Sequence, residues 1–199
     1  PDLFNSLGKY QRAKEYYDKA LAIVIEIGNR QKEETINMNL GAIFNSLCEY
    51  HKAKEYHEKA LAIAIEIGDK QGERTSNENL GVMFHSRGEY KKAKEYLEKA
   101  LAIAVEIGHK PGEGTNNEHL GAVFHSLGEY QKAKEYHEKA LAIAIEIGHK
   151  LGEGRSNENL GAVFHSLGEY QKAEEFYEKA LAIAIEIGDR RGEGTRNGN

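Results

Sequence analysis

The stretch Gly114 to Glu153 reads GTNNEHLGAVFHSLGEYQKAKEYHEKALAIAIEIGHKLGE, and the following forty residues repeat it almost letter for letter. A tyrosine recurs at the same forty-residue step along the chain, as Tyr10, Tyr50, Tyr90, Tyr130 and Tyr170. A fixed period of this length is typical of repeat arrays. Such arrays bury a series of local cores instead of one central core. Function is therefore to be sought on a surface that the repeats share.

Each repeat contains two segments of periodic apolar residues, divided near Gly88, Gly128 or Gly168. In the second segment, alanine and isoleucine recur at steps of three and four residues, which is the spacing of one buried helical stripe. A glycine follows the last apolar turn of each second segment, where a left-handed residue closes a helix. These glycines are Gly28, Gly68, Gly108, Gly148 and Gly188. The sequence therefore predicts antiparallel helix pairs and an all-α fold.

We expect one solenoid domain over residues 1–199. A truncated repeat covers residues 1–33, four full repeats cover 34–73, 74–113, 114–153 and 154–193, and residues 194–199 begin another. The truncated repeat keeps only Pro1 to Leu7 of its first helix, so the chain is expected to be a fragment of a longer protein.

Composition excludes several classes of partner. The formal net charge is -5, and lysine and glutamate alternate in every repeat, so no basic field attracts nucleic acid or an anionic membrane. No apolar run approaches the roughly 18 residues of a membrane span. The single cysteine, Cys48, excludes an intramolecular disulfide and replaces a turn glycine. We therefore expect an intracellular, cytoplasmic protein.

The repeat resembles the tetratricopeptide repeat (TPR). Small residues stand where two helices touch and large residues fill the space between them. The residues that carry the resemblance are Asn159-Leu160-Gly161, Phe164, Leu167-Gly168-Glu169-Tyr170, Ala173, Tyr177 and Ala180-Leu181. The repeat length of forty residues resembles that of the TPR branch found in LGN/Pins-type scaffolds and large animal TPR arrays. The resemblance implies a right-handed superhelical α-solenoid, a non-enzymatic scaffold whose first helices line a concave groove for an extended or helical peptide.

A polar stripe on each first helix matches this expected groove. With an advance of about 100° per residue, the stripe lies opposite Leu120, Gly121 and Phe124. One position of the stripe forms a ladder of Asn39, Asn79, His119 and Asn159. An amide offers both a donor and an acceptor, so such a ladder is suited to a peptide backbone of any sequence. In the LGN-like branch, asparagines at the matching place have this role.

Charged and imidazole side chains flank the ladder. They are Glu78, Glu118, Glu158, His85, His125, His165 and Arg155. The three glutamates predict a preference for basic peptide segments. We expect all of these residues to belong to the peptide-binding groove.

The nine histidines do not indicate a metal site. Equivalent residues of adjacent repeats lie on helices about 10 Å apart, whereas zinc needs nitrogens at about 2.1 Å. His57 and His137 occupy the slot of Tyr17, Leu97 and Tyr177, and we interpret them as packing residues. No nucleophile has a fixed base, so the sequence predicts no enzyme, no metal and no cofactor.

A recurrent asparagine lies on the core side of the first helices. The four residues are Asn37, Asn77, Asn117 and Asn157. Because a buried amide is costly unless it is hydrogen-bonded, we expect each to reach a backbone carbonyl or a neighbouring unit.

Two further possibilities concern the array as a whole. The repeats are nearly identical, which also fits a structural spacer or self-associating regulatory arm of a larger protein without a groove ligand. Terminal repeats without polar outer faces predict weak end-to-end association between chains. We expect Phe176, Ile183 and Ile187 to form an apolar shoulder at the C-terminal end, and Phe4 and Leu7 to leave the other end unshielded.

Overall fold

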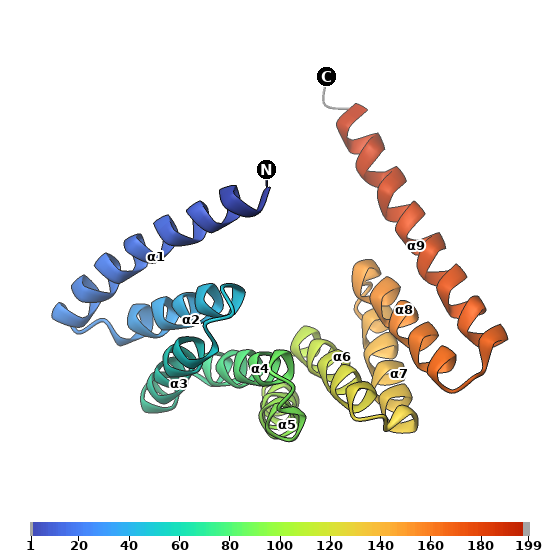
Figure 1. Cartoon of the computed structure of the whole chain (residues 1–199), viewed down its shortest axis with the longest axis horizontal. Helices are drawn as coiled ribbons and strands as arrows, with labels where there is room; N and C mark the ends of the chain where they lie inside the picture. The colour runs from blue at the N-terminus through green and yellow to red at the C-terminus, as the bar shows by residue number, and fades with distance from the viewer. Residues whose placement is uncertain (1, 197–199) are drawn as a thin grey trace. The chain divides into compact units, whose positions relative to one another are not determined.

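The computed structural model describes the backbone of residues 2–196 and the side chains of residues 10–188. Between residues 2 and 196 it contains nine α-helices and no strand, which confirms the all-α fold class (Figure 1). The helices are α1 (Asp2–Glu26), α2 (Arg30–Ser46), α3 (Tyr50–Ile67), α4 (Lys70–Ser86), α5 (Tyr90–Glu106), α6 (Lys110–Ser126), α7 (Tyr130–Glu146), α8 (Lys150–Ser166) and α9 (Tyr170–Arg196).

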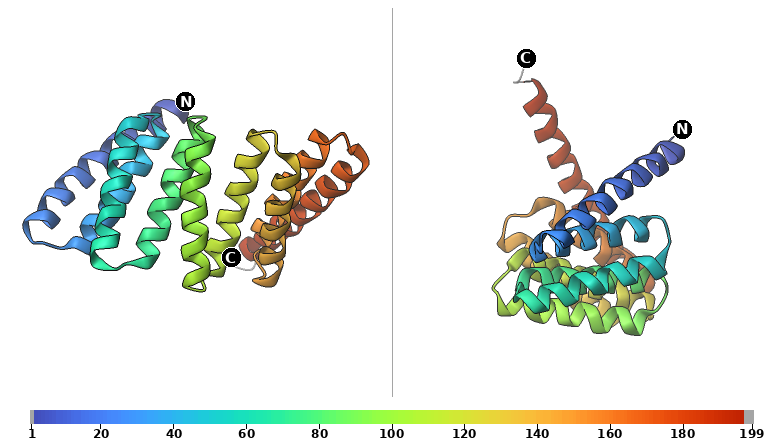
Figure 2. Two further views of the ribbon diagram at one scale, coloured as in Figure 1. Left: turned by 90° about the horizontal axis from the view of Figure 1, so that it is seen from below. Right: turned by 90° about the vertical axis from the view of Figure 1, so that its left-hand side faces the viewer.

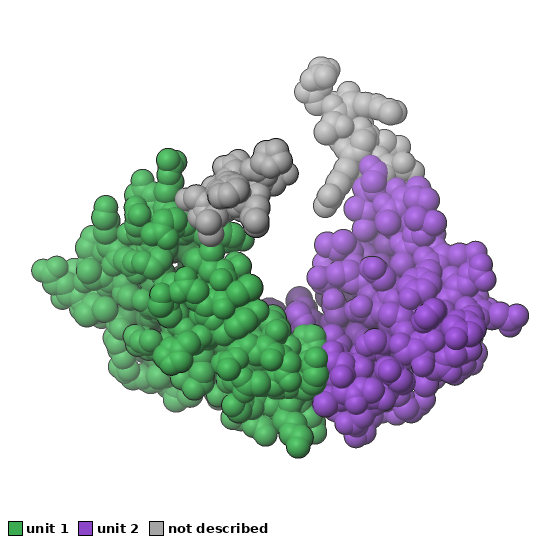
Figure 3. All heavy atoms as spheres, in the orientation of Figure 1, with its two compact units in different colours: residues 1–107 green, residues 108–199 purple. Residues whose placement is uncertain are grey.

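The chain divides into two compact units, residues 1–107 and residues 108–199, which are described separately (Figure 3). In the first unit α2 pairs with α3 and α4 with α5, and in the second α6 pairs with α7 and α8 with α9. Neighbouring pairs within a unit also touch, through α3 with α4 and α7 with α8. Figure 2 shows the helices α2 to α5 side by side, each running opposite to its neighbour. The assigned repeat boundaries fall four residues inside each first helix, for example at residue 34 in α2.

Large apolar side chains fill the space within each pair. Leu40, Leu80, Leu120 and Leu160 are fully buried. Full burial of such a side chain stabilises the fold by roughly 1.5–3 kcal/mol. Four stacked ring pairs, with centroids 5.1–5.4 Å apart, lie beside these leucines: Phe44 with Tyr56, Phe84 with Tyr96, Phe124 with Tyr136 and Phe164 with Phe176. The periodic apolar residues of the sequence therefore form the core.

Glycine on each first helix lets the paired helices approach closely. A Cβ atom added at Gly41 would lie 2.5 Å from the ring of His57, and one added at Gly121 would lie 2.5 Å from the ring of His137. His57 and His137 are 1% and 2% exposed, and each Nδ1 atom has no hydrogen-bond partner among the described residues. Burial lowers the pKa of each imidazole to about 4. The interpretation of both histidines as packing residues is confirmed.

The core-side asparagines donate hydrogen bonds within their own helices, whereas the buried Oδ1 atoms of Asn37, Asn77 and Asn117 have no partner among the described residues. Each Nδ2 atom donates a hydrogen bond of 2.8 Å to the backbone carbonyl four residues earlier. The pairs are Asn37 with Glu33, Asn77 with Glu73, Asn117 with Glu113 and Asn157 with Glu153. The expected bond to a backbone carbonyl is confirmed.

Most helix ends follow the glycine pattern, with one exception. Gly28, Gly68, Gly108 and Gly148 have φ angles of +66° to +72°. Gly188 is helical instead, because α9 continues to Arg196, so the expected helix end there is wrong. The expected break after Leu7 is also wrong, since α1 runs from Asp2 to Glu26 without interruption.

The expected apolar shoulder at the C-terminal end is only partly correct. Ile183 is 8% exposed and packs beside Gly154, where an added Cβ atom would lie 3.3 Å away. Phe176 and Ile187 are half-buried. Side chains on another face of α9 are more exposed: Tyr170 at 65%, Tyr177 at 40% and Leu181 at 61%. The side chains of Phe4 and Leu7 lie outside the described residues.

Candidate functional site

The predicted groove residues lie along one face of the first helices in each unit. In the first unit this face belongs to α2 and α4, and in the second to α6 and α8, and the two helices of each face touch. The core side of α6 is buried at Leu120, Gly121 and Phe124, whereas Glu118 and His119 are half-exposed. The helical periodicity therefore separates the polar stripe from the core as predicted. We call these two surfaces the first groove face (α2, α4) and the second groove face (α6, α8).

The ladder residues are accessible on both faces. Asn39 and Asn79 are half-exposed on the first groove face, and His119 and Asn159 are half-exposed on the second. Among the side chains at residues 10–188, none forms a hydrogen bond with the amide of Asn39, Asn79 or Asn159. His119 already has a partner within the chain. Three of the four ladder positions can therefore offer both a donor and an acceptor to a ligand.

Two of the three flanking glutamates are neutralised within the chain. Arg74, which is 7% exposed, forms an ion pair and hydrogen bond with Glu78 one turn away in α4. Arg155 of α8 reaches across to Glu118 of α6, with 3.4 Å between Nη2 and Oε2. Glu158 is exposed and has no ion-pair partner within the described residues. The negative charge of the stripe is therefore smaller than the sequence indicates, and it is concentrated at Glu158.

The histidine row packs against the tyrosines that begin the second helices. The ring centroids of His85 and Tyr90 are 5.5 Å apart, those of His125 and Tyr130 5.3 Å, and those of His165 and Tyr170 5.2 Å. On the second groove face, Nε2 of His125 also lies 3.0 Å from Oγ of Ser166. Each histidine of the row therefore contacts the first residue of the second helix in its own pair.

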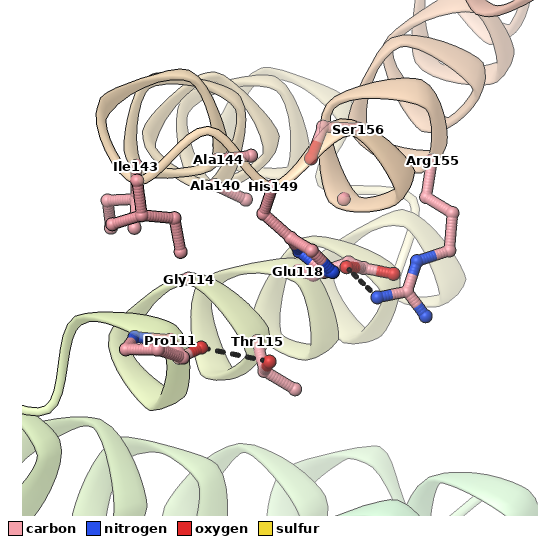
Figure 4. A pocket seen from close by; sticks show the side chains of 12 residues that line it. Pro111, Gly114, Thr115, Glu118, Ala140, Ile143, Ala144, His149, Arg155 and Ser156 are labelled. Carbon is pink, nitrogen blue, oxygen red and sulfur yellow. Dashed lines mark hydrogen bonds and ion pairs between the residues drawn. The ribbon is translucent and has the colours of Figure 1, made fainter. Parts of the chain in front are cut away.

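A small hollow opens between α6, α7 and α8 next to the Glu118–Arg155 pair (Figure 4). Glycine and alanine line it at Gly114, Ala140 and Ala144, where larger side chains would fill the space. The hollow has room for about one water molecule, which is far less than a cofactor needs. No group of three or more histidine, cysteine, aspartate or glutamate side chains gathers into a metal site within the described part of the chain.

Sequence reasoning missed two partners of the predicted site residues. Arg74 was not connected with Glu78, although their i, i+4 spacing is a sequence signal for a helical ion pair. The tyrosines beside the histidine row marked the repeat period and the resemblance to the TPR, but they were not connected with the histidines. Their contact depends on the angle between two helices, which the spacing of residues does not specify. None of the helices between residues 2 and 196 combines the length and apolarity needed to cross a membrane.

Several solved structures share this architecture. BtubC (BKLC) from P. vanneervenii is 25% identical, with 94% of this chain and 78% of that chain covered and a TM-score of 0.83. The putative kinesin light chain TPR-like repeats of Podosopora anserina are 20% identical, with 92% and 91% covered and a TM-score of 0.73. Aspartyl phosphate phosphatase F from Bacillus subtilis is 17% identical, with 94% and 50% covered and a TM-score of 0.84. The last two similarities show the fold alone.

No curated protein matches the chain. The tetratricopeptide repeat profile matches residues 32–104 and 113–186, and a second profile of the same repeat matches residues 2–23. The resemblance to the LGN/Pins branch stays a prediction. The matched segments cover most of the sequence, and the chain belongs to the tetratricopeptide repeat family.

Proposed function

We propose that each groove face binds a peptide segment of a partner protein, with Asn39 and Asn79 holding the peptide backbone on the first face and Asn159 holding it on the second. Tetratricopeptide repeat domains generally act as protein-interaction modules and are typically non-catalytic. The observation that carries the proposal is the set of three half-exposed amides without hydrogen-bond partners among the described side chains. Asn39 and Asn79 occupy the same repeat position on α2 and α4, so their amides recur along the first groove face as the donors and acceptors of a peptide backbone do. The resemblance to LGN/Pins-type scaffolds supports the same role.

The charge preference of the ligand follows from the ion pairs. Glu78 and Glu118 are already compensated by Arg74 and Arg155, so Glu158 is the acid that remains to attract a basic side chain. The preference for basic segments is therefore expected to be modest and to depend on the second groove face. His119, beside Asn159 on that face, extends the contact surface but offers less free hydrogen-bonding capacity.

Peptide titration tests the proposal. Fluorescently labelled Lys/Arg-rich and Asp/Glu-rich peptides of equal length are titrated with the whole chain, and binding is measured by polarisation. The basic peptides should bind more tightly, and Asn79→Ala combined with Asn159→Ala should weaken binding at least tenfold, because two side-chain amides that hydrogen-bond the peptide backbone are lost. Glu158→Gln should reduce the preference for basic peptides without abolishing binding.

A matched control removes two amides from a different surface. Gln131→Ala with Gln171→Ala alters exposed positions at the start of α7 and α9, and it should leave affinity unchanged. If no peptide binds, or if both double variants bind equally well, the groove proposal fails. The spacer or regulatory-arm function would then be the better interpretation. Tighter binding of the acidic peptides would reject only the charge preference.

A further inference from the structure

A hollow lies between the two second helices of the second unit. Helices α7 and α9 both pack on α8, but among the described residues they do not pack on each other. The hollow between them has a volume of about 670 Å³, solvent included, which is within the roughly 300–1,000 Å³ of ligand sites. Leu141 and Ile145 of α7 line one side, and Phe176 and Ile183 of α9 line the other. We call this hollow the α7–α9 recess.

The side chains of the α7–α9 recess are as exposed as their counterparts in the first unit. There α3 and α5 both pack on α4, again without packing on each other. Ile65 of α3 and Ile145 of α7 are both 58% exposed, and Asn77 and Asn157 are 3% and 4% exposed. Exposed aliphatic side chains gathered beside a hollow are typical of an interaction surface.

A hydrogen-bond acceptor without a partner lies at the floor of the recess. Asn157 of α8 lines the recess, and its Nδ2 atom donates to the carbonyl of Glu153 at 2.8 Å. No described residue donates a hydrogen bond to its Oδ1 atom. In the first unit the equivalent Oδ1 atom of Asn77 is fully buried, so a ligand has no access to it. Because an unpaired buried acceptor is costly, a ligand that brings an N–H donor into the α7–α9 recess is stabilised there.

The recess also carries one uncompensated positive charge. The Nζ atom of Lys179, which lines the recess, lies 4.7 Å from the centroid of the Phe176 ring. None of the described carboxylates forms an ion pair with Lys179. The carboxylate at the floor, Glu153, is paired with Lys150 at 3.0 Å. A ligand that carries a carboxylate beside an apolar side chain therefore complements both the charge and the apolar walls.

We propose that the α7–α9 recess binds an extended segment of a partner protein in which an aliphatic side chain stands next to aspartate or glutamate. The aliphatic side chain contacts Leu141 and Ile145, the carboxylate pairs with Lys179, and a backbone N–H donates to Oδ1 of Asn157. The segment is extended because the backbone N–H groups of a helix are already bonded within the helix, whereas those of an extended chain are free.

This site is separate from the second groove face. Asn159, which belongs to that face, follows Asn157 by two residues and therefore lies about 200° around α8 from it. The proposal consequently does not depend on peptide binding by the groove faces.

Labelled peptides of alternating valine and aspartate test the proposal. They are titrated with the whole chain beside peptides of alternating valine and lysine, and binding is followed by fluorescence polarisation. We expect the valine–aspartate peptide to bind at least fivefold more tightly. Ile145→Asp should weaken it by a factor of five or more, and Lys179→Glu should remove the preference between the two peptides. A valine–aspartate peptide with N-methylated backbone nitrogens should bind at least fivefold more weakly, because it cannot donate to Asn157.

Two controls separate the recess from its counterpart in the first unit and from the groove faces. Ile65→Asp is matched to Ile145→Asp, because Ile65 has the same exposure but lies in the unit where the acceptor of Asn77 is closed. This variant and Asn79→Ala with Asn159→Ala should both bind the valine–aspartate peptide normally. Circular dichroism confirms that each variant is folded.

Several outcomes would overturn the proposal. These are tighter binding of the valine–lysine peptide, no binding of the valine–aspartate peptide at millimolar concentration, an equal loss with Ile65→Asp and Ile145→Asp, or full affinity of the N-methylated peptide. A loss with Asn79→Ala and Asn159→Ala as large as that with Ile145→Asp would show that the peptide occupies the groove faces instead.

Discussion

The helix pairs α2–α3 and α4–α5 have the same architecture but differ at several buried or strained positions. Three of these differences are His57 against Leu97, Glu34 against Arg74, and Cys48 against Gly88. The close approach of the helices, through Gly41 or Gly81, is the same in both. The fold therefore tolerates a change of chemistry where the volume and backbone are kept. The two pairs should therefore differ in the pH dependence of their stability and in backbone strain, and not in their structure.

The largest loss of stability should follow substitution of the glycine at which the two helices of each pair approach closely. A Cβ atom at Gly41 would lie 2.5 Å from the His57 ring, and one at Gly81 would lie 2.5 Å from Leu97 Cγ and 3.2 Å from the Ala93 carbonyl oxygen. Because neither neighbour has room to move, Gly41→Ala and Gly81→Ala should each lower the free energy of unfolding by about 2–3 kcal/mol. Urea denaturation at pH 7.5 measures this.

Gly161→Ala is the matched control for these two variants. Its neighbour is the Tyr177 ring, which is 40% exposed and free to rotate outward. The steric cost should be small, and alanine has the better helix propensity by about 1 kcal/mol. A loss at Gly161 as large as that at Gly81 would show that backbone contact, and not the facing side chain, sets the cost.

His57 should make the α2–α3 pair sensitive to acid. Its pKa is lowered from 6.5 to about 4, so the folded state binds the proton less tightly than the unfolded state does. This contribution to stability is complete above pH 6.5 and is lost as the pH falls toward 4. Between pH 8 and pH 5 the loss should be about 2 kcal/mol. His57→Leu, measured by denaturation at both pH values, should remove it.

The reverse substitution in the α4–α5 pair, Leu97→His, tests the same acid sensitivity. Leu97→His should introduce the same acid sensitivity, because Leu97 is fully buried in the equivalent slot. A variant whose stability is unchanged between pH 8 and pH 5 would indicate that the α4–α5 slot admits water or a hydrogen-bond partner that the His57 slot lacks.

Glu34 should make stability fall as the pH rises, whereas His57 makes it fall as the pH drops. Its side chain is fully buried against Gly72, and burial together with nearby Asp69 raises its pKa from 4.5 to about 7. The folded state therefore holds the proton more tightly, and the stability this confers is complete below pH 4.5 and lost as the pH rises through 7. Glu34→Gln should raise the free energy of unfolding by about 3 kcal/mol at pH 8 and change it little at pH 4.5.

Arg74→Gln is the control for this titration in the neighbouring pair. Arg74 keeps its charge throughout this range, so its replacement should change stability by a similar amount at both pH values. If Glu34→Gln gave the same change at pH 4.5 and pH 8, Glu34 would not be titrating in this window.

The smallest effect should come from the turn between the paired helices. Cys48 has a φ angle of +58°, where Gly88 has +76°. A residue with a Cβ atom is strained in the left-handed region, so Cys48→Gly should stabilise the chain by about 1 kcal/mol or less. Thermal unfolding checks this, and Gly88→Ala should change stability by a similar amount with the opposite sign.

The sequence predicted helix existence and pairing better than helix ends. Periodic apolar residues placed Leu120 and Phe124 in the core, because burial of a helical stripe follows directly from spacing. The glycine pattern was correct for Gly148 and wrong for Gly188. A left-handed glycine closes a helix only where the following segment packs back on its neighbour, and α9 runs on through Gly188 to Arg196.

For the candidate site, the sequence predicted positions better than charges. Asn39, Asn79 and Asn159 are half-exposed on the predicted face, because one helical turn determines which side a residue occupies. Their role in binding stays a prediction. The effective charge of Glu118 was not predictable from spacing along one helix, since its partner Arg155 lies on another helix.

The sequence by itself determined the repeat period, the helix pairs, the core residues and the family, because these depend on local spacing and on the size of side chains. Only the tertiary structure decided which glutamates are neutralised and that Glu34 and His57 are buried without compensating charge. Electrostatics and exposure depend on what a neighbouring helix brings within a few ångströms. Tyr130 and Tyr170, at the same repeat position, therefore differ in exposure although residues 120–133 and 160–173 are identical.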